Sequence, residues 1–126
     1  MEFLRRFALW ATCAALVITA DVVTKVAPHH EVATNYSHAS AALYLAIGVF
    51  LLTVGVVHSP LVSVGAGFMF GALCGNAGQL MIAGFATDWI EIGGWLTNVA
   101  DIAGGVGLLV CVIGFILPLT RLPRRR

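Results

Sequence analysis

The hydrophobic positions of the chain fall into four long runs separated by short polar segments. The runs cover residues 7–23, 41–57, 61–83 and 99–117. Each is close to the ~20 apolar residues with which an α-helix crosses the ~30 Å hydrocarbon core of a bilayer. The pattern predicts an all-α integral membrane four-helix bundle. Because no linker or change of composition divides the chain, we expect residues 1–126 to form a single domain.

The composition changes this picture little. The chain is 60% hydrophobic and 10% charged, with a mean hydropathy of +0.95, which is more apolar surface than a soluble domain of this size buries. Cys13, Cys74 and Cys111 lie within the apolar runs and are odd in number, so we interpret them as small hydrophobic residues rather than disulfide partners. The sequence predicts no cofactor and no nucleic-acid partner.

The placement of the charges predicts an orientation. Six of the seven basic residues lie close to the ends of the chain, namely Arg5, Arg6, Arg121, Arg124, Arg125 and Arg126. Under the positive-inside rule both termini are then expected in the cytoplasm, which requires an even number of crossings. Five of the six acidic residues would lie at or near the outer side, namely Asp21, Glu31, Asp88, Glu91 and Asp101. We therefore expect polar chemistry at the outer side.

The first run carries two charges near its outer end. Asp21 and Lys25 are one helical turn apart and can form an ion pair there. That pair is either purely structural or positions a substrate, because ionisable groups near hydrocarbon need a partner or a function. The basic start followed by an apolar run also resembles a secretory signal peptide, with Ala20 as the cleavage point. Cleavage there would leave an odd number of crossings.

Glycines and tryptophans indicate how the helices pack and where they end. Gly67, Gly71 and Gly75 form a small-residue stripe on the third run, and Ala100 and Gly104 offer the same on the fourth. Such stripes let neighbouring backbones approach closely. The tight segment at residues 58–60 predicts an antiparallel hairpin of the second and third helices. Amphipathic rings favour the two membrane interfaces, so we expect interfacial anchors at Trp10, Trp89 and Trp95.

Asp88 and Asp101 are the candidates for chemistry. Asp88 follows the third run, and the hairpin between the runs can return it to the start of the fourth, where Asp101 lies. Asn98 and Asp101 also suit a helix cap. Two close carboxylates do not ionise together easily, so one keeps a proton while the other acts as a base. This is the apparatus of an aspartic peptidase, and the helix N-terminus favours Asp101 as the anion.

The polar segments around these residues contain three short motifs. Residues 75–80 read Gly-Asn-Ala-Gly-Gln-Leu, residues 84–90 read Gly-Phe-Ala-Thr-Asp-Trp-Ile, and residues 98–101 read Asn-Val-Ala-Asp. They resemble the motifs of lipoprotein signal peptidase, or signal peptidase II, a family that has Gly-Asn-x-x-Asp-Arg, Val-Val-Asp-Phe and Asn-x-Ala-Asp in that order. Asp-Val-Val-Thr-Lys at residues 21–25 is similar to its Asp-Gln-x-Thr/Ser-Lys. The resemblance covers all four predicted helices.

The resemblance implies a function and a location. Asp88 and Asp101 match the catalytic aspartates, and the matched motifs imply a substrate-binding set of Asn76, Asn98, Asp21, Lys25 and Asn35. The family cleaves signal peptides from prolipoproteins that carry a diacylglyceryl group. It therefore implies a bacterial cytoplasmic (inner) membrane protein with its active site on the outer side. The implied partners are membrane lipids, that diacylglyceryl-modified prolipoprotein and, in an accessory role, another protein of a membrane complex.

The chain departs from the family pattern at the site. Gln79 and Leu80 stand where the family has Asp-Arg, and leucine lacks the donors of an arginine. The first outer loop is short for the family's β-cradle, and the segment between Asp88 and Asp101 is clipped. An alternative function is therefore a catalytically impaired relative that binds lipid or serves as an accessory subunit.

Two other classes stay open at this point. The loop residues His29, His30, Glu31 and His38 include good zinc ligands, although their spacing fits no helical ligand pattern. The sequence therefore favours solvated loop histidines, and we assign no metal ligands. Asn76 and Gln79, one helical turn apart, could line a polar path in a transporter or channel subunit. The absence of an internal repeat disfavours a stand-alone transporter.

Overall fold

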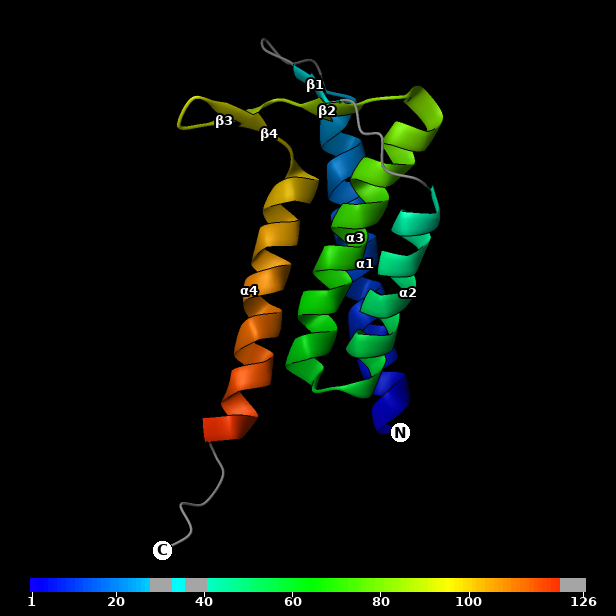
Figure 1. Ribbon diagram of the computed structural model, residues 1–126, viewed down its shortest axis with the longest axis vertical. Coiled ribbons are helices and arrows are strands. Elements are labelled where there is room, and N and C mark those ends of the chain that lie inside the picture. Colours follow the sequence, from blue (N-terminus) through cyan, green and yellow to red (C-terminus); the bar gives the residue numbers. More distant parts are fainter. Residues whose placement is uncertain (28–32, 36–40, 121–126) are drawn as a thin grey trace, which may run out of the picture.

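The computed structural model describes residues 1–27, 33–35 and 41–120, and these segments are mainly helical. The helices are α1 (Glu2–Lys25), α2 (Ala41–Val57), α3 (Pro60–Ala83) and α4 (Val99–Thr120). They run along the long axis of the molecule, and the start of α1 and the end of α4 lie at the same end (Figure 1). Each helix covers one of the predicted apolar runs. The prediction of a mainly α-helical protein with four apolar helices is therefore confirmed.

Three of the described helices are long and apolar enough to cross a membrane. These are α1, α3 and α4 as far as Pro118. The apolar helix α2 matches the predicted run but has 17 residues, which at 1.5 Å per residue is only about 26 Å. The helices support a membrane protein, whereas the cytoplasmic placement of both termini stays a prediction.

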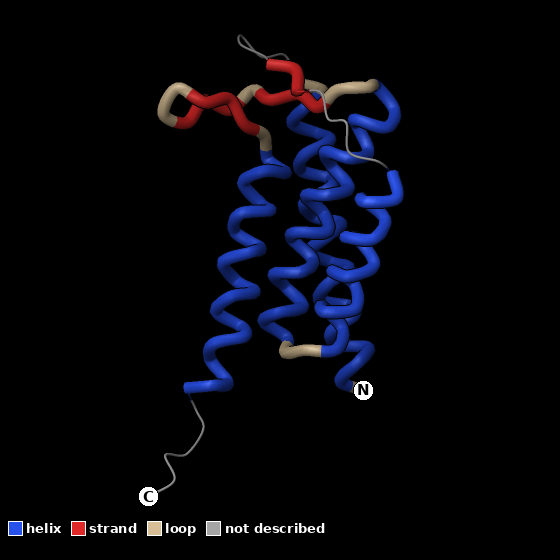
Figure 2. Tube along the Cα trace, in the orientation of Figure 1, coloured by secondary structure: helices blue, strands red, loops and turns tan. Residues whose placement is uncertain are grey.

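Four short strands lie together at one end of the helices (Figure 2). Strand β1 (Ala33–Asn35) pairs antiparallel with β2 (Ala86–Asp88), and β3 (Ile90–Ile92) pairs antiparallel with β4 (Trp95–Thr97). The sequence analysis predicted no strands, and the described part of the first outer loop nevertheless contributes one. These strands bring the segment before α2 and the segment between α3 and α4 together at the outer end predicted from the charges.

The glycine stripe of α3 packs against α1. A Cβ added at Gly67 would lie 2.5 Å from the carbonyl oxygen of Trp10, and one at Gly71 would lie 2.7 Å from the Cβ of Val17. On another side, a Cβ at Gly104 of α4 would lie 3.4 Å from the Cβ of Ala72. The predicted close approach of backbones is confirmed, and it makes α3 the element on which α1 and α4 both pack.

Trp10 is a core residue rather than an interfacial anchor. Its side chain is buried, and its ring centroid lies 4.6 Å from that of Phe70. The space for the indole comes from Gly55 on α2, where an added Cβ would lie 2.7 Å from the ring. The anchor prediction for Trp10 is therefore wrong, because a small residue on a neighbouring helix provides a pocket that the local sequence around Trp10 does not reveal.

The turn between α2 and α3 has the predicted hairpin form. Ser59 is the N-cap of α3, its Oγ accepts a hydrogen bond from the backbone N of Val62 at 3.3 Å, and Pro60 occupies the first turn. A serine cap followed by proline is a strong start signal because proline has no N–H that needs a partner there. The short turn makes α2 and α3 antiparallel neighbours.

Candidate functional site

A buried ion pair lies at the strand-bearing end of α1. Lys25 Nζ is 2.8 Å from Asp21 Oδ2, and both side chains are almost wholly buried. The backbone N of Ala100, in the first turn of α4, donates to Asp21 Oδ1 at 3.0 Å. Gly75 leaves the space for this carboxylate, since a Cβ there would lie 2.6 Å from Asp21 Oδ2. The Asp21 carboxylate of α1 therefore bonds to the first turn of α4 and packs against Gly75 of α3.

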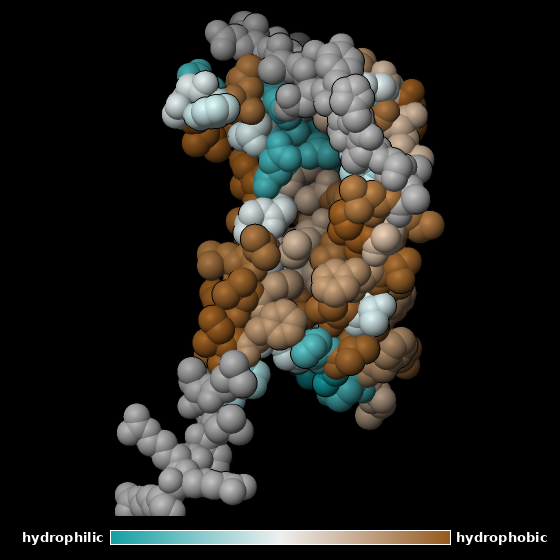
Figure 3. Space-filling view, in the orientation of Figure 1, coloured by the Kyte–Doolittle hydropathy of each residue, from teal (hydrophilic) through white to brown (hydrophobic). Residues whose placement is uncertain are grey.

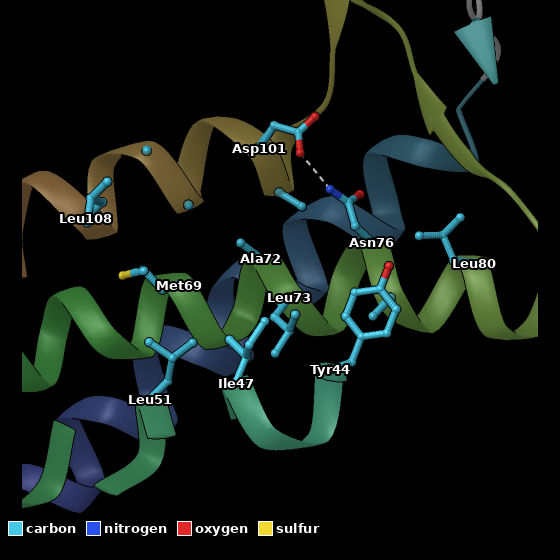
Figure 4. A pocket seen from close by; sticks show the side chains of 14 residues that line it. Tyr44, Ile47, Leu51, Met69, Ala72, Leu73, Asn76, Leu80, Asp101 and Leu108 are labelled. Carbon is cyan, nitrogen blue, oxygen red and sulfur yellow. Dashed lines mark hydrogen bonds between the residues drawn. The ribbon is translucent and has the colours of Figure 1, made fainter. Parts of the chain in front are cut away.

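Asn76 extends this ion pair toward α4. Lys25 Nζ donates to Asn76 Oδ1 at 2.8 Å, and Asn76 Nδ2 donates to Asp101 Oδ1 at 2.7 Å (Figure 4). An amide suits this position because its oxygen accepts from an ammonium group while its nitrogen donates to a carboxylate. A continuous polar chain thus runs from Asp21 through Lys25 and Asn76 to Asp101.

Asn98 links the two candidate catalytic aspartates. Its Oδ1 accepts a hydrogen bond from the backbone N of Asp101 at 2.9 Å, which is the cap that the sequence predicted. Its Nδ2 donates a short hydrogen bond to Asp88 Oδ1. Thr97 Oγ1 donates to Asp101 Oδ2 at 3.2 Å. The buried Asn98 side chain therefore holds β2 against the start of α4.

Asp88 is buried, and its surroundings favour the protonated acid. Only 1% of the residue is exposed. Burial raises the pKa of its carboxyl above the ordinary aspartate value, the hydrogen bond from Asn98 opposes that shift, and the negative charge of Asp101 adds to it. The backbone of Ala33 in β1 lies opposite Asp88 in the strand pairing. The segment between α3 and α4 thus holds a buried carboxyl group with a raised pKa next to strand β1.

Asp101 faces a groove, whereas Asp88 is not among the groove's lining residues. The groove has a volume of about 420 Å³ and lies on α3 between α2 and α4. Asp101 and Asn76 lie at one end of it, and its other lining residues are mainly apolar, including Ile47, Leu73 and Leu80 (Figure 4). Figure 3 shows hydrophilic surface gathered near the strand-bearing end, with hydrophobic helix surface below it. The groove is therefore apolar along most of its lining and has the exposed carboxylate of Asp101 at one end.

Gln79 has a structural contact that the sequence analysis did not predict. Its Nε2 donates to Thr87 Oγ1 at 2.7 Å, and its Oε1 accepts from the backbone N of Thr87 at 3.0 Å. This pair of bonds attaches β2 to α3 one residue before Asp88. Gln79 stands where the resembled family has an aspartate, and an amide supplies both the donor and the acceptor that the contact needs.

The side chains of the other sequence-predicted candidates lie outside the described residues. The backbone of Asn35 lies in β1, opposite Ala86, and its side chain is outside the described residues, as are His29, His30, Glu31 and His38. Among the described residues, no group of three or more His, Cys, Asp or Glu side chains is arranged to hold a metal ion. The structure therefore brings together Asp21, Lys25, Asn76, Asp88, Asn98 and Asp101.

Solved structures similar to the chain include two that are described as bacterial membrane enzymes. No protein-family model matches it, and no curated relative matches it. A structure described as a bacterial membrane enzyme, obtained by the in meso method, has a TM-score of 0.73 at 19% identity and covers 93% of this chain and 92% of that one. A second with the same description has a TM-score of 0.72 at 15% identity, covering 85% and 92%. The chain therefore shares the fold of bacterial membrane enzymes.

Proposed function

We propose that the chain is a signal peptidase II-like aspartic endopeptidase of the bacterial inner membrane, with Asp88 and Asp101 as its catalytic pair. The observation that carries this proposal is the hydrogen bonding of Asn98, whose side-chain amide bonds to the buried carboxyl group of Asp88 and to the backbone N of the exposed Asp101. The proposed substrates are prolipoproteins whose signal peptide precedes a diacylglyceryl-modified cysteine, as the motif resemblance implies.

The two carboxyl groups differ in the way that hydrolysis requires. Asp101 accepts hydrogen bonds from Asn76 and Thr97 on both of its oxygens, as suits an ionised carboxylate. It takes a proton from water while the water oxygen bonds to the scissile carbonyl carbon. Asp88, whose pKa is raised by burial, gives its proton to the carbonyl oxygen. When the carbon–nitrogen bond breaks, the amine receives the proton from Asp101, and Asp88 regains one from the collapsing diol.

The groove provides the binding surface for this reaction. Its apolar walls on α2, α3 and α4 suit a hydrophobic peptide or acyl chain, and Asn76 and Asp101 lie at its polar end. A substrate held there contacts Asp101 directly. Asp88 is almost fully covered, so binding must also expose its acidic proton. Asp21 and Lys25 act as positioning residues, since Lys25 connects to Asp101 through Asn76 and Asp21 bonds to the backbone N of the neighbouring Ala100.

The test is cleavage of a diacylglyceryl-modified prolipoprotein by the purified chain of residues 1–126 in lipid. We expect Asp88→Asn and Asp101→Asn each to lower the rate by about 10²–10⁴-fold, the range for a lost general acid or base. The matched control is Glu91→Gln, which neutralises an exposed carboxylate three residues after Asp88 and should leave the rate unchanged. Equal rates for the wild type and both aspartate variants would overturn the proposal.

A second candidate function is favoured by one observation. Asp88 is only 1% exposed and does not line the groove, as expected if the chain binds a lipid-modified partner without cleaving it. In that case the wild type and Asp101→Asn retain the modified prolipoprotein equally during copurification, and neither yields a product. Cleavage by the wild type alone excludes this candidate.

A further inference from the structure

The β3–β4 hairpin has an apolar face that nothing in the described part of the chain covers. In the strand pairing Ile92 lies opposite Trp95, and Glu91 lies opposite Leu96. Residues that pair directly share a face of a two-stranded sheet, and successive residues alternate. Ile92 and Trp95 therefore lie on one face, and Glu91 lies on the other. The exposed fractions are 55% for Ile92 and 80% for Trp95.

The hairpin has a two-glycine turn and projects away from the helices. Gly93 and Gly94 both have positive φ, at 59° and 83°, as a two-residue hairpin turn requires. A Cβ added at either glycine would meet no atom within 4 Å. Figure 1 shows the hairpin projecting sideways beyond the top of α4, away from α1, α2 and α3.

The level of the hairpin matches the surface of a bilayer. β4 ends at Thr97, and α4 begins at Val99, two residues later. The membrane-length part of α4 has 20 residues, which is about 30 Å of helix and equals the hydrocarbon thickness. A sideways projection from the start of α4 therefore runs along the boundary between headgroups and acyl chains. Figure 3 shows hydrophobic surface on the side of the projection toward the helices.

We propose that the β3–β4 hairpin is a membrane-interface anchor that inserts Ile92 and Trp95 into the leaflet next to the candidate site. Tryptophan suits this level because its ring is apolar while its N–H can bond to headgroups or water. Glu91, on the opposite face, stays in water. The partner is the lipid surface itself, since the hairpin is joined directly to a membrane-length helix.

The proposed anchor also fixes the depth of the Asp88 and Asp101 carboxyl groups relative to the membrane. β3 begins two residues after Asp88, and Asn98 follows β4 directly. The backbone N of Trp89 donates to the carbonyl oxygen of Thr97 at 2.9 Å. This hydrogen bond joins the two arms of the hairpin at its base, next to Asp88 and Asn98. A tip held in the leaflet thus fixes the depth of Asp88 and Asp101 relative to the lipid. The inference does not depend on peptide cleavage, and its test uses no substrate.

The test measures the depth of neighbouring positions on opposite faces of the hairpin. Ile92→Cys and, as the matched control, Glu91→Cys are made in a full chain whose Cys13, Cys74 and Cys111 are replaced by alanine. Each thiol carries an environment-sensitive fluorophore, and the protein is reconstituted in phosphatidylcholine vesicles. We expect the label at position 92 to emit at shorter wavelength, to be quenched by spin-labelled lipid and to be protected from aqueous iodide. The label at position 91 should be open to iodide.

Two outcomes overturn the proposal. One is equal access of iodide to the two labels, which would place both faces in water. The other is a label at position 92 that is protected from both iodide and spin-labelled lipid, which would indicate coverage by protein. Trp95→Cys reports on the same face and replaces Ile92→Cys should that variant fail to fold, as judged by its helical circular dichroism.

Discussion

Helix α3 contacts its neighbours in two chemically different ways along its length. In its middle, Gly67 meets α1 so closely that an added Cβ would lie 2.5 Å from a backbone carbonyl oxygen. At its strand-bearing end, Asn76 lies between Lys25 and Asp101 and contacts both by hydrogen bonds. Packing at the first region depends on volume, whereas at the second it depends on charge and on the direction of donors and acceptors. We therefore expect the two regions to fail under different substitutions.

The largest loss of stability is expected when one charge is removed at the polar, strand-bearing end of α3. Asp21→Asn conserves size but leaves the Lys25 ammonium without its anion, and breaking a buried pair on one side costs about 3–5 kcal/mol. The free energy of unfolding in detergent micelles measures the loss. The double variant Asp21→Asn, Lys25→Met removes both charges and should recover most of it. Equal losses in the single and double variants would show that charge does not govern this region.

A smaller loss is expected from added volume at the glycine contact. Gly67→Ala forces α1 and α3 apart, and overpacking of this kind costs about 1–3 kcal/mol. The control is Gly78→Ala on the same helix, where a Cβ would meet nothing within 4 Å. That change should stabilise the helix by up to about 1 kcal/mol through its higher propensity. Thermal unfolding of the two variants side by side distinguishes close packing from a general effect of glycine.

The next prediction tests the placement of hydrogen-bond donors and acceptors, rather than charge, at the polar end of α3. Asn76→Leu keeps a similar volume but removes the acceptor for Lys25 and the donor for Asp101, and we expect a loss of about 1.5 kcal/mol. The exposed side of Asp101 limits the loss because water replaces one bond. Thr53→Val on α2, whose exposed hydroxyl bonds only within its own helix, should change stability by less than about 0.5 kcal/mol. Urea titration of the two variants in micelles would refute the argument if their midpoints were equally shifted.

The smallest effect concerns pH, and it tests the buried acid of β2. Because the pKa of Asp88 is raised in the folded protein, folding favours its protonated form. Its contribution to stability is therefore fully present below the ordinary aspartate pKa and is lost as the pH rises through the raised pKa. Asp88→Asn imitates the protonated form, so its stability should gain on that of the wild type as pH increases. Parallel pH profiles of unfolding for the two proteins would contradict the raised pKa.

The apolar runs predict the helices well, because a long unbroken apolar run is itself a local signal for a membrane helix, although α2 has only 17 residues. The strands were missed for an equally physical reason. β1 to β4 have three residues each, which is too short for an alternating pattern to appear. The pairing of β1 with β2 joins segments that are more than fifty residues apart, such as Ala33 and Asp88, and no local feature of either segment indicates that partner. The β3–β4 hairpin does have a local signal, the Gly93–Gly94 turn, which the sequence analysis did not use.

The polar cluster was predictable where its contacts are local in sequence. The pairing of Asp21 with Lys25 and the cap of Asn98 on Asp101 are one-turn relationships, and both are present. The bridge by Asn76 joins α1 to α4 through α3 and could not be read from spacing. Nor does the sequence indicate that Asp88 is covered while Asp101 is exposed, since that difference comes from tertiary packing.

The groove on α3 has a consequence for how any ligand would arrive. Two of its walls, α3 and α4, are helices of membrane length, the third is the shorter apolar helix α2, and its lining is mainly apolar, so a hydrophobic ligand would enter sideways by diffusion within the two-dimensional leaflet. The quantity that governs occupancy is then the mole fraction of ligand among the lipids rather than its concentration in the aqueous volume. Adding inert lipid or detergent at constant protein and ligand should dilute the ligand in that surface and slow every step that depends on the encounter.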